Sequence, residues 1–156
     1  IPLAIGQTMP ALIFDGVLQR FPTLRFGAIE LGAAWLPSWL QTMDAGFAAF
    51  KKGEARLQKL SLLPSEYARR QLRVTPYSHE PTEWILNQSD PTMLLFSSDF
   101  PHVEGGRNPL KRFEDQLLNA APASKDRFYR DNFIDLMGEG LASHLRYSKS
   151  EAATQH

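Results

Sequence analysis

The chain has 156 residues, which is enough for one domain with a substantial hydrophobic core. Its 17 basic and 17 acidic residues give a formal net charge of zero without any basic block, so we expect no nucleic-acid partner and no anionic membrane partner. The absence of cysteine excludes disulfides, thiolate zinc sites and a cysteine nucleophile. The sequence has no apolar run long enough to cross a membrane and no signal-peptide pattern, and we expect a cytoplasmic protein.

The first third of the chain predicts a helix, a strand and a second helix. Apolar residues recur at helical spacing over 9–21, and Pro22 ends the pattern because the residue before a proline avoids the helical region. Residues 24–31 are mostly apolar and predict a short strand that is buried on both faces. Apolar steps of three and four then predict an amphipathic helix over 34–51, with Pro37 in its first turn.

The middle of the chain repeats this alternation. A helical turn over 64–70 precedes a second expected strand over 72–77. A short helix follows over 81–88, and we expect its Trp84 to face inward. Residues 92–97 (TMLLFS) are the clearest buried strand in the sequence.

The last part of the chain is expected to be helical. Asn108 followed by Pro109 gives a helix start, since asparagine caps helices well and proline fits the first helical position. A second helix is expected over 123–137. The polar residues 148–156 predict a disordered tail.

Strands that alternate with helices predict right-handed crossovers and a parallel sheet of about three strands in an α/β fold. Three strands form a thin sheet for so many apolar helices, and both of its edges lack partners. We therefore expect the chain to be part of something larger. We also expect its uncovered apolar edges to drive self-association or to bind the missing part of the fold.

The carboxyl ends of the expected strands select candidate functional residues, because parallel α/β folds place their sites there. Glu30 ends the first strand, His79 lies in the loop after the second, and Asp99 and His102 follow the third. An aspartate directly after a buried strand can hold a divalent cation or take a proton from bound water. A histidine three residues later can serve as a second ligand or as an acid/base group.

Each candidate also has a plainer interpretation. An aspartate at such a position can simply cap a turn, a lone acid at a strand end is often salt-bridged or solvated, and loop histidines are commonly exposed. The sequence contains no G-x-S-x-G, P-loop or G-x-G-x-x-G motif, so serine-nucleophile and nucleotide-binding alternatives are set aside.

Four segments, in this order along the chain, resemble the amidohydrolase-related family, also called amidohydrolase-2. They are residues 20–37 (RFPTLRFGAIELGAAWLP), 63–67 (LPSEY), 96–105 (FSSDFPHVEG) and 132–138 (NFIDLMG). The resemblance covers most of residues 9–140. It implies a metal-dependent (β/α)8 TIM barrel, of which residues 1–147 are the C-terminal part and contain the last three strands.

The resemblance also implies roles for the candidate residues. Asp99 matches the family's last-strand metal ligand, which orients or deprotonates a metal-bound water. His102 matches the Asp-aromatic-Pro-His pattern and is expected to support that ligand. Glu30 stands where many decarboxylase-type members carry a histidine and a subset carries a glutamate; it can accept a proton, bind the metal or hold a ligand in place. The implied cofactor is a divalent metal ion, zinc, whose other ligands are expected outside this chain.

The implied activity is that of a metal-dependent hydrolase, in which metal-activated water attacks a carbonyl-type carbon of a small-molecule substrate. His79 is expected to contact that substrate. A non-oxidative decarboxylase of the same family is one alternative, and a non-catalytic scaffold or partner domain that has lost its metal is another. Because a catalytic zinc needs about three protein ligands and no H-x-H pair is present, we expect this chain alone to be inactive and to bind zinc weakly or not at all.

Overall fold

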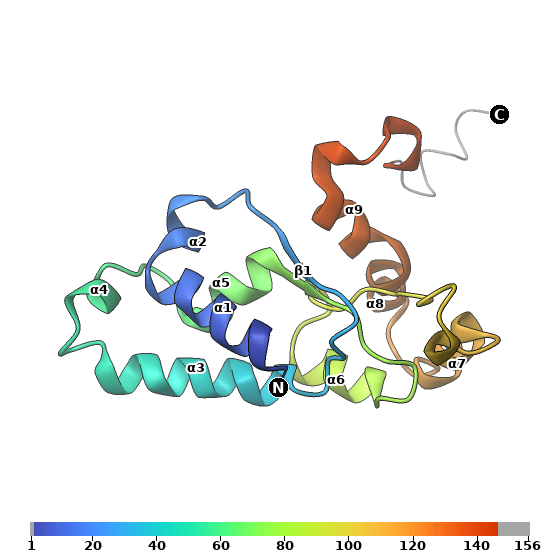
Figure 1. Ribbon diagram of the computed structural model, residues 1–156, viewed down its shortest axis with the longest axis horizontal. Coiled ribbons are helices and arrows are strands. Elements are labelled where there is room, and N and C mark those ends of the chain that lie inside the picture. The colour runs from blue at the N-terminus through green and yellow to red at the C-terminus, as the bar shows by residue number, and fades with distance from the viewer. Residues whose placement is uncertain (1, 147–156) are drawn as a thin grey trace.

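The computed structural model describes residues 2–146, apart from the side chain of Glu104, and is a helix-rich α/β arrangement around two parallel strands (Figure 1). The strands are β1 (Phe26–Ala28) and β2 (Leu72–Val74). The helices are α1 (Leu3–Phe14), α2 (Val17–Arg20), α3 (Leu36–Phe50), α4 (Ala55–Gln58), α5 (Pro64–Gln71), α6 (Thr82–Gln88), α7 (Pro109–Gln116), α8 (Pro122–Asp126) and α9 (Asn132–Met137). The tail expected at 148–156 lies outside the described residues. Among these helices, none has both the length and the apolar character needed to cross a membrane.

The two strands confirm the expected parallel pairing. They run in register, with Phe26 opposite Leu72 and Ala28 opposite Val74. Both are shorter than the sequence predicts, at three residues each. The sheet therefore positions the loops that leave its carboxyl edge, and most of the packing comes from the helices.

The prediction of a third full strand over 92–97 is wrong. This segment meets β2 through a single parallel bridge, between Val74 and Leu94. A turn fixed by the Asp90 carboxylate, which accepts the N–H of Thr92 at 2.7 Å, occupies the residues before the bridge. After the bridge the N–H of Phe96 donates to a carbonyl of the C-terminal helical segment rather than to β2. The segment still runs parallel to β2 and delivers the following loop to the same edge.

The single helix expected over 9–21 is two helices. Gly16 adopts a φ of +74°, a left-handed conformation that ends α1 and precedes α2. The helical segment expected over 123–137 is confirmed, since it begins at Pro122 and ends at Met137. A π-helical turn at Arg127–Asp131 divides it into α8 and α9.

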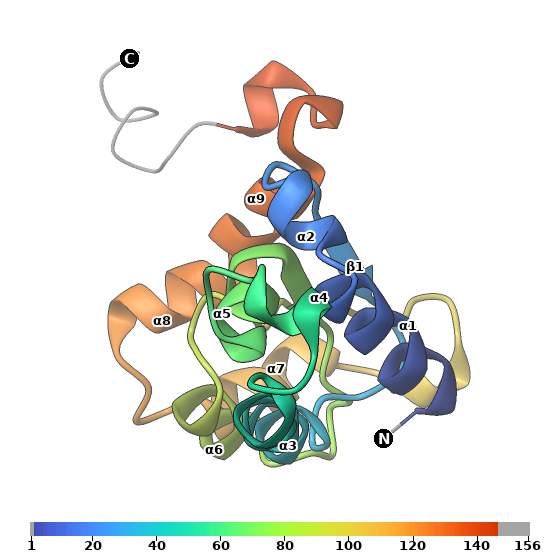
Figure 2. The same cartoon turned by 90° about the vertical axis from the view of Figure 1, so that its left-hand side faces the viewer.

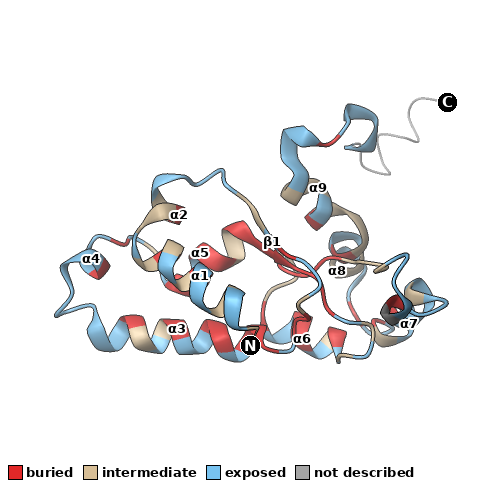
Figure 3. Cartoon of the chain, viewed as in Figure 1, coloured by how far each residue is buried: buried red, intermediate tan, exposed pale blue. Residues whose placement is uncertain are grey.

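The hydrophobic core includes α3, α5 and the strands and extends to buried residues of α1, α6, α7 and the π-helical turn (Figure 3). The expected amphipathic pattern of α3 is confirmed, since its buried face includes Leu36, Trp39 and Phe47. Helix α5 contacts both α3 and α1. Figure 2 shows α3 nearly end-on below α5. The prediction that Trp84 faces inward is wrong. Its side chain is 53% exposed, because Ile85 and Leu86 lie on the buried face of α6.

Asp135 on α9 ties the C-terminal helix to both strands. Its carboxylate accepts hydrogen bonds from Nε of Arg25, just before β1, at 3.0 Å and from Nη2 of Arg73 in β2 at 2.6 Å. Burial lowers the pKa of Arg73, and the charge of Asp135 opposes that effect. Burial of Asp135 favours its protonated form, but the hydrogen bond from Arg25 and the charges of both arginines outweigh this and hold the pKa of Asp135 below its usual value.

We expect this cluster to make the fold less stable in acid. The pKa of Asp135 is lower in the folded chain than the ordinary value of 3.8. The cluster therefore stabilises the fold above that pH, and the stabilisation is lost as pH falls through the folded pKa. Asp135→Asn should lower the free energy of unfolding at pH 7 by about 1–3 kcal/mol, and we expect the low end of this range because Asp135 is partly exposed. The variant should also lose less unfolding free energy than the unaltered chain when the pH falls from about 5 to about 2.

Urea unfolding at a series of pH values checks this expectation. Asp15→Asn is the control, because Asp15 forms an exposed ion pair with Arg56 at 3.1 Å. It should change the unfolding free energy by less than about 0.5 kcal/mol. An acid dependence that Asp135→Asn leaves unaltered contradicts the assignment.

Candidate functional site at the carboxyl edge of the strands

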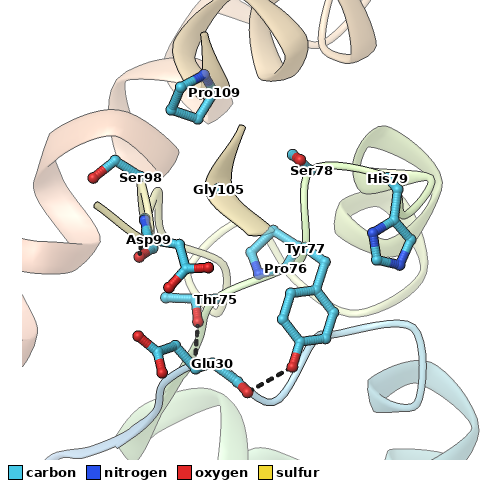
Figure 4. Close-up of a pocket in the computed structure, with 11 residues that line it drawn as sticks. Glu30, Thr75, Pro76, Tyr77, Ser78, His79, Ser98, Asp99, Gly105 and Pro109 are labelled. Carbon is cyan, nitrogen blue, oxygen red and sulfur yellow. Dashed lines mark hydrogen bonds between the residues drawn. The ribbon is translucent and has the colours of Figure 1, made fainter. Parts of the chain in front are cut away.

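The loops that follow β1, β2 and the Leu94 segment line a cavity of about 210 Å³ (Figure 4). Glu30 enters it from the first loop, Tyr77 from the second and Asp99 from the third. Three loops that are distant in sequence therefore meet here because the segments preceding them are parallel and adjacent.

The structure brings together Glu30, Asp99 and His102 from the predicted set. One ligand atom from each side chain lies within 4.8 Å of those of the other two. Nδ1 of His102 is 2.9 Å from Oδ1 of Asp99 and 3.8 Å from Oε1 of Glu30. The proximity of the three residues is thus observed, and their chemical roles stay predictions.

His79 does not join this cluster. Its exposed ring stacks on Tyr77, with ring centroids 5.5 Å apart and an interplanar angle of 12°. Figure 4 shows it on the opposite side of Tyr77 from Glu30. His79 nevertheless lines the cavity, so contact with a substrate remains a prediction.

Glu30 is held in an uncommon backbone conformation, with a φ of +59°. Its N–H donates to Oγ1 of Thr75 at 3.0 Å, and its carbonyl accepts a hydrogen bond from the Tyr77 hydroxyl at 2.7 Å (Figure 4). Sequence reasoning missed these two residues as supports of the site. The only available signal was their place just after β2, at the edge where Glu30 was also expected.

Asp99 also has a left-handed backbone, with a φ of +56°. The N–H of His102 donates to its carbonyl at 2.8 Å, so the turn is closed by backbone atoms. Among the described residues, no backbone N–H donates to the Asp99 carboxylate, which instead contacts the His102 ring. The Asp99 carboxylate therefore caps no backbone N–H of this turn in the described residues, and its contact is with the side chain of His102 three residues later.

The packing of Gly105 fixes the path of the Asp99 loop. Gly105 is buried, and a Cβ atom at this position would lie 2.3 Å from the carbonyl oxygen of Ser98 and 3.2 Å from Cβ of Asp99. Only a residue without a side chain allows the loop to fold back so closely. The glycine thereby lets the loop pack directly against Ser98 and Asp99.

The donor set fits part of a site for a divalent cation. Two carboxylates and an imidazole are among the ligand types that zinc and manganese take in proteins. The Asp99 side chain is 19% exposed, whereas those of Glu30 and His102 are 54% and 59% exposed. Asp99 is thus the most buried of the three candidate ligands. The contact between His102 and Asp99 also matches that of a histidine that orients a ligating carboxylate.

Comparison with solved structures finds an amidohydrolase and a decarboxylase. The amidohydrolase map2389c from Mycobacterium avium subsp. paratuberculosis K-10 is similar with a TM-score of 0.73 and 27% identity, over 86% of this chain and 33% of that chain. The 5-carboxyvanillate decarboxylase from Novosphingobium aromaticivorans DSM 12444, complexed with manganese and 4-hydroxy-3-methoxy-5-nitrobenzoic acid, has a TM-score of 0.65 and 18% identity, over 84% of this chain and 38% of that chain. A mutant of that decarboxylase with bound manganese has a TM-score of 0.63 and 18% identity, over 83% of this chain and 37% of that chain.

The chain spans between a third and two fifths of the length of these solved chains. No protein-family model matches the sequence, and no curated protein matches it. The similarity therefore supports, at the level of structure, the relation to amidohydrolase barrels that the sequence motifs predict. At 18% identity the likeness to the decarboxylase is one of fold alone. The neighbours include both an amidohydrolase and a decarboxylase, so the predicted hydrolase is not distinguished from its alternative.

Proposed function

We propose that this chain is the C-terminal part of the barrel of a metal-dependent enzyme of the amidohydrolase type. The observation that supports this most directly is the meeting of Glu30, Asp99 and His102 at the carboxyl edge of the strands, where barrel enzymes keep their sites. The similarity to the amidohydrolase from Mycobacterium avium is the second support.

Asp99 is the residue proposed to bind the metal ion. A divalent cation held there would supply a Lewis acid and lower the pKa of a water molecule. The Asp99 carboxylate would hold the cation and accept a proton. His102 fixes the orientation of that carboxylate through the 2.9 Å contact to Oδ1, and Glu30 provides a second acceptor for a proton or for the cation.

The remaining ligands are proposed to come from a part of the barrel that this chain does not contain. In the described part of the chain, β1 pairs only with β2, so the other edge of β1 is where a further strand can add. Docking of the missing barrel half at this edge is the proposed partnership, and self-association is its alternative. Manganese is the metal to test first, because both decarboxylase structures contain it, and zinc is the second.

A decarboxylase is the second candidate function. It is favoured by the two structures of 5-carboxyvanillate decarboxylase among the neighbours. In that case the residues of the site, with a bound cation, would orient a substrate carboxylate. The bond between that carboxylate and the substrate carbon would break to release carbon dioxide, and the carbon would take up a proton in its place.

A substrate screen of the intact protein loaded with Mn²⁺ separates the two functions. Esters, lactones and amides should yield an acid and an alcohol or amine if the protein is a hydrolase. Aromatic acids labelled with ¹³C at the carboxylate should release labelled carbon dioxide if it is a decarboxylase. Release of carbon dioxide without any ester or amide product contradicts the hydrolase, and no turnover of either class by the metal-loaded protein contradicts an enzyme.

We expect the 156-residue chain by itself to show no turnover in the same assays. Because His102 is proposed to orient Asp99 rather than to bind the cation, the cluster supplies only two carboxylate ligands, fewer than the about three protein ligands of a catalytic site. Titration with Mn²⁺ or Zn²⁺ followed by calorimetry should give weak binding or none. Stoichiometric zinc that remains on the purified chain through dialysis contradicts this expectation.

A further inference from the structure

The side chain of Glu80, in the loop between β2 and α6, accepts hydrogen bonds from the backbones of two loops. Oε2 accepts the N–H of Ala33 at 2.8 Å and the N–H of Tyr77 at 2.8 Å, and Oε1 accepts the N–H of Ala34 at 3.0 Å. Hydrogen bonds from N–H groups to an ionised carboxylate are stronger than those to a neutral acceptor. One side chain therefore connects the loop after β1 to the loop after β2.

The loop after β1 contains Glu30, and the loop after β2 donates a hydrogen bond to it. The two alanines follow Glu30 by three and four residues, and the Tyr77 hydroxyl donates to the Glu30 carbonyl at 2.7 Å (Figure 4). Gly32 lies between Glu30 and the two alanines in the sequence and has a φ of +63°. A Cβ atom at Gly32 would be 2.8 Å from Oε1 of Glu80 and 2.9 Å from the Tyr77 ring, so the first loop packs directly against both residues.

The conformation of Glu30 needs such support. A left-handed backbone at a residue with a Cβ atom is unfavourable, and it persists only where the surroundings impose it. Two of the groups that impose it at Glu30 belong to the loop after β2, namely the side chains of Thr75 and Tyr77. Glu80 fixes the backbone of Tyr77 and also the chain just beyond Glu30.

We propose that Glu80 is a positioning residue for the candidate site. It clamps the two loops together, so that Glu30 keeps its left-handed backbone and presents its carboxylate beside Asp99 and His102. The relevance to catalysis rests on the proposed function, whereas the clamp itself can be measured without metal or substrate.

Glu80→Ala and Glu66→Ala form a matched pair of variants. Glu66 also accepts a backbone N–H, from Leu63 at 2.7 Å, but this bond caps the start of α5 and involves neither of the two loops that Glu80 connects. In Glu80→Ala, amide exchange at Ala33, Ala34 and Tyr77 should be at least about tenfold faster, and the ¹³Cα shift of Glu30 should move away from its left-handed value. Glu66→Ala should leave these amides and that shift unchanged.

Glu80→Gln tests the geometry further and covers the case in which the alanine variant does not fold. It keeps one acceptor oxygen, so it should retain protection of some of the three amides but not of all. The proposal is overturned if Glu80→Ala leaves the Glu30 shift and the three amides unchanged, or if Glu66→Ala alters them equally, because the effect would then be one of general stability.

Titration of the intact protein with Mn²⁺, followed by electron paramagnetic resonance, connects the clamp to the site. Glu80→Ala should weaken Mn²⁺ binding by about tenfold, the size expected for loss of a residue that supports a ligand. If the unaltered protein binds no Mn²⁺, the proposed metal-dependent function fails, while the exchange and shift data still decide whether Glu80 positions Glu30. Unchanged Mn²⁺ affinity in Glu80→Ala overturns its role at the site.

Discussion

Asp99→Asn in the intact protein is expected to lower kcat/KM by about 100- to 10,000-fold, the range that a general acid or base contributes. The amide keeps an oxygen that can still meet Nδ1 of His102, so the loop should keep its path. It lacks the negative charge that binds a cation and the basicity that accepts a proton. Steady-state kinetics with Mn²⁺ measure the loss, and thermal unfolding should show a midpoint within a few degrees of the unaltered protein.

Asp115→Asn is the matched control for this variant. It makes the same chemical change at an exposed carboxylate that forms an ion pair with Lys111 on α7. It should leave kcat/KM unchanged, because Asp115 does not line the cavity. If Asp99→Asn retains the full rate as well, Asp99 has only a structural role in its turn, and the proposed metal site has lost its main ligand.

The candidate cluster could be predicted from the sequence because its prediction depended on strand direction and not on strand length. The segment at 92–97 is not a full strand, and it makes one bridge to β2. That bridge is parallel, so the residues after it still reach the edge where β1 and β2 end. Asp99 and His102 therefore arrive beside Glu30 even though the sheet is smaller than expected.

The supports of the cluster could not be predicted, because they depend on where loops cross. Glu80 bonds to Ala33, 47 residues earlier, and nothing in the local pattern around Glu80 indicates that contact. Asp135 and Arg25 are 110 residues apart and meet only after α9 packs on the strands. In contrast, the break at Gly16 had a local signal, since an aspartate followed by a glycine is typical of a turn.

Gly105→Ala is expected to destabilise the fold by about 1–3 kcal/mol, the usual result of forcing an extra methyl group into a packed site. The added Cβ would lie 2.3 Å from the carbonyl oxygen of Ser98, which belongs to the backbone and cannot rotate away as a side chain can. The loop must therefore shift, and Asp99, next to Ser98, must shift with it. We expect Mn²⁺ binding by the intact protein to weaken together with the stability.

Gly46→Ala provides a control of opposite sign. Gly46 lies within α3, and a Cβ atom there would meet nothing within 4 Å, so the substitution should stabilise the chain by about 0.5–1 kcal/mol through better helix propensity. Urea unfolding measures the change in unfolding free energy of each variant, and both variants make the same Gly→Ala substitution. If Gly105→Ala also stabilises the chain, or if it leaves Mn²⁺ binding intact, then the close packing of Gly105 does not determine the position of Asp99, and the loop tolerates more freedom than its contacts imply.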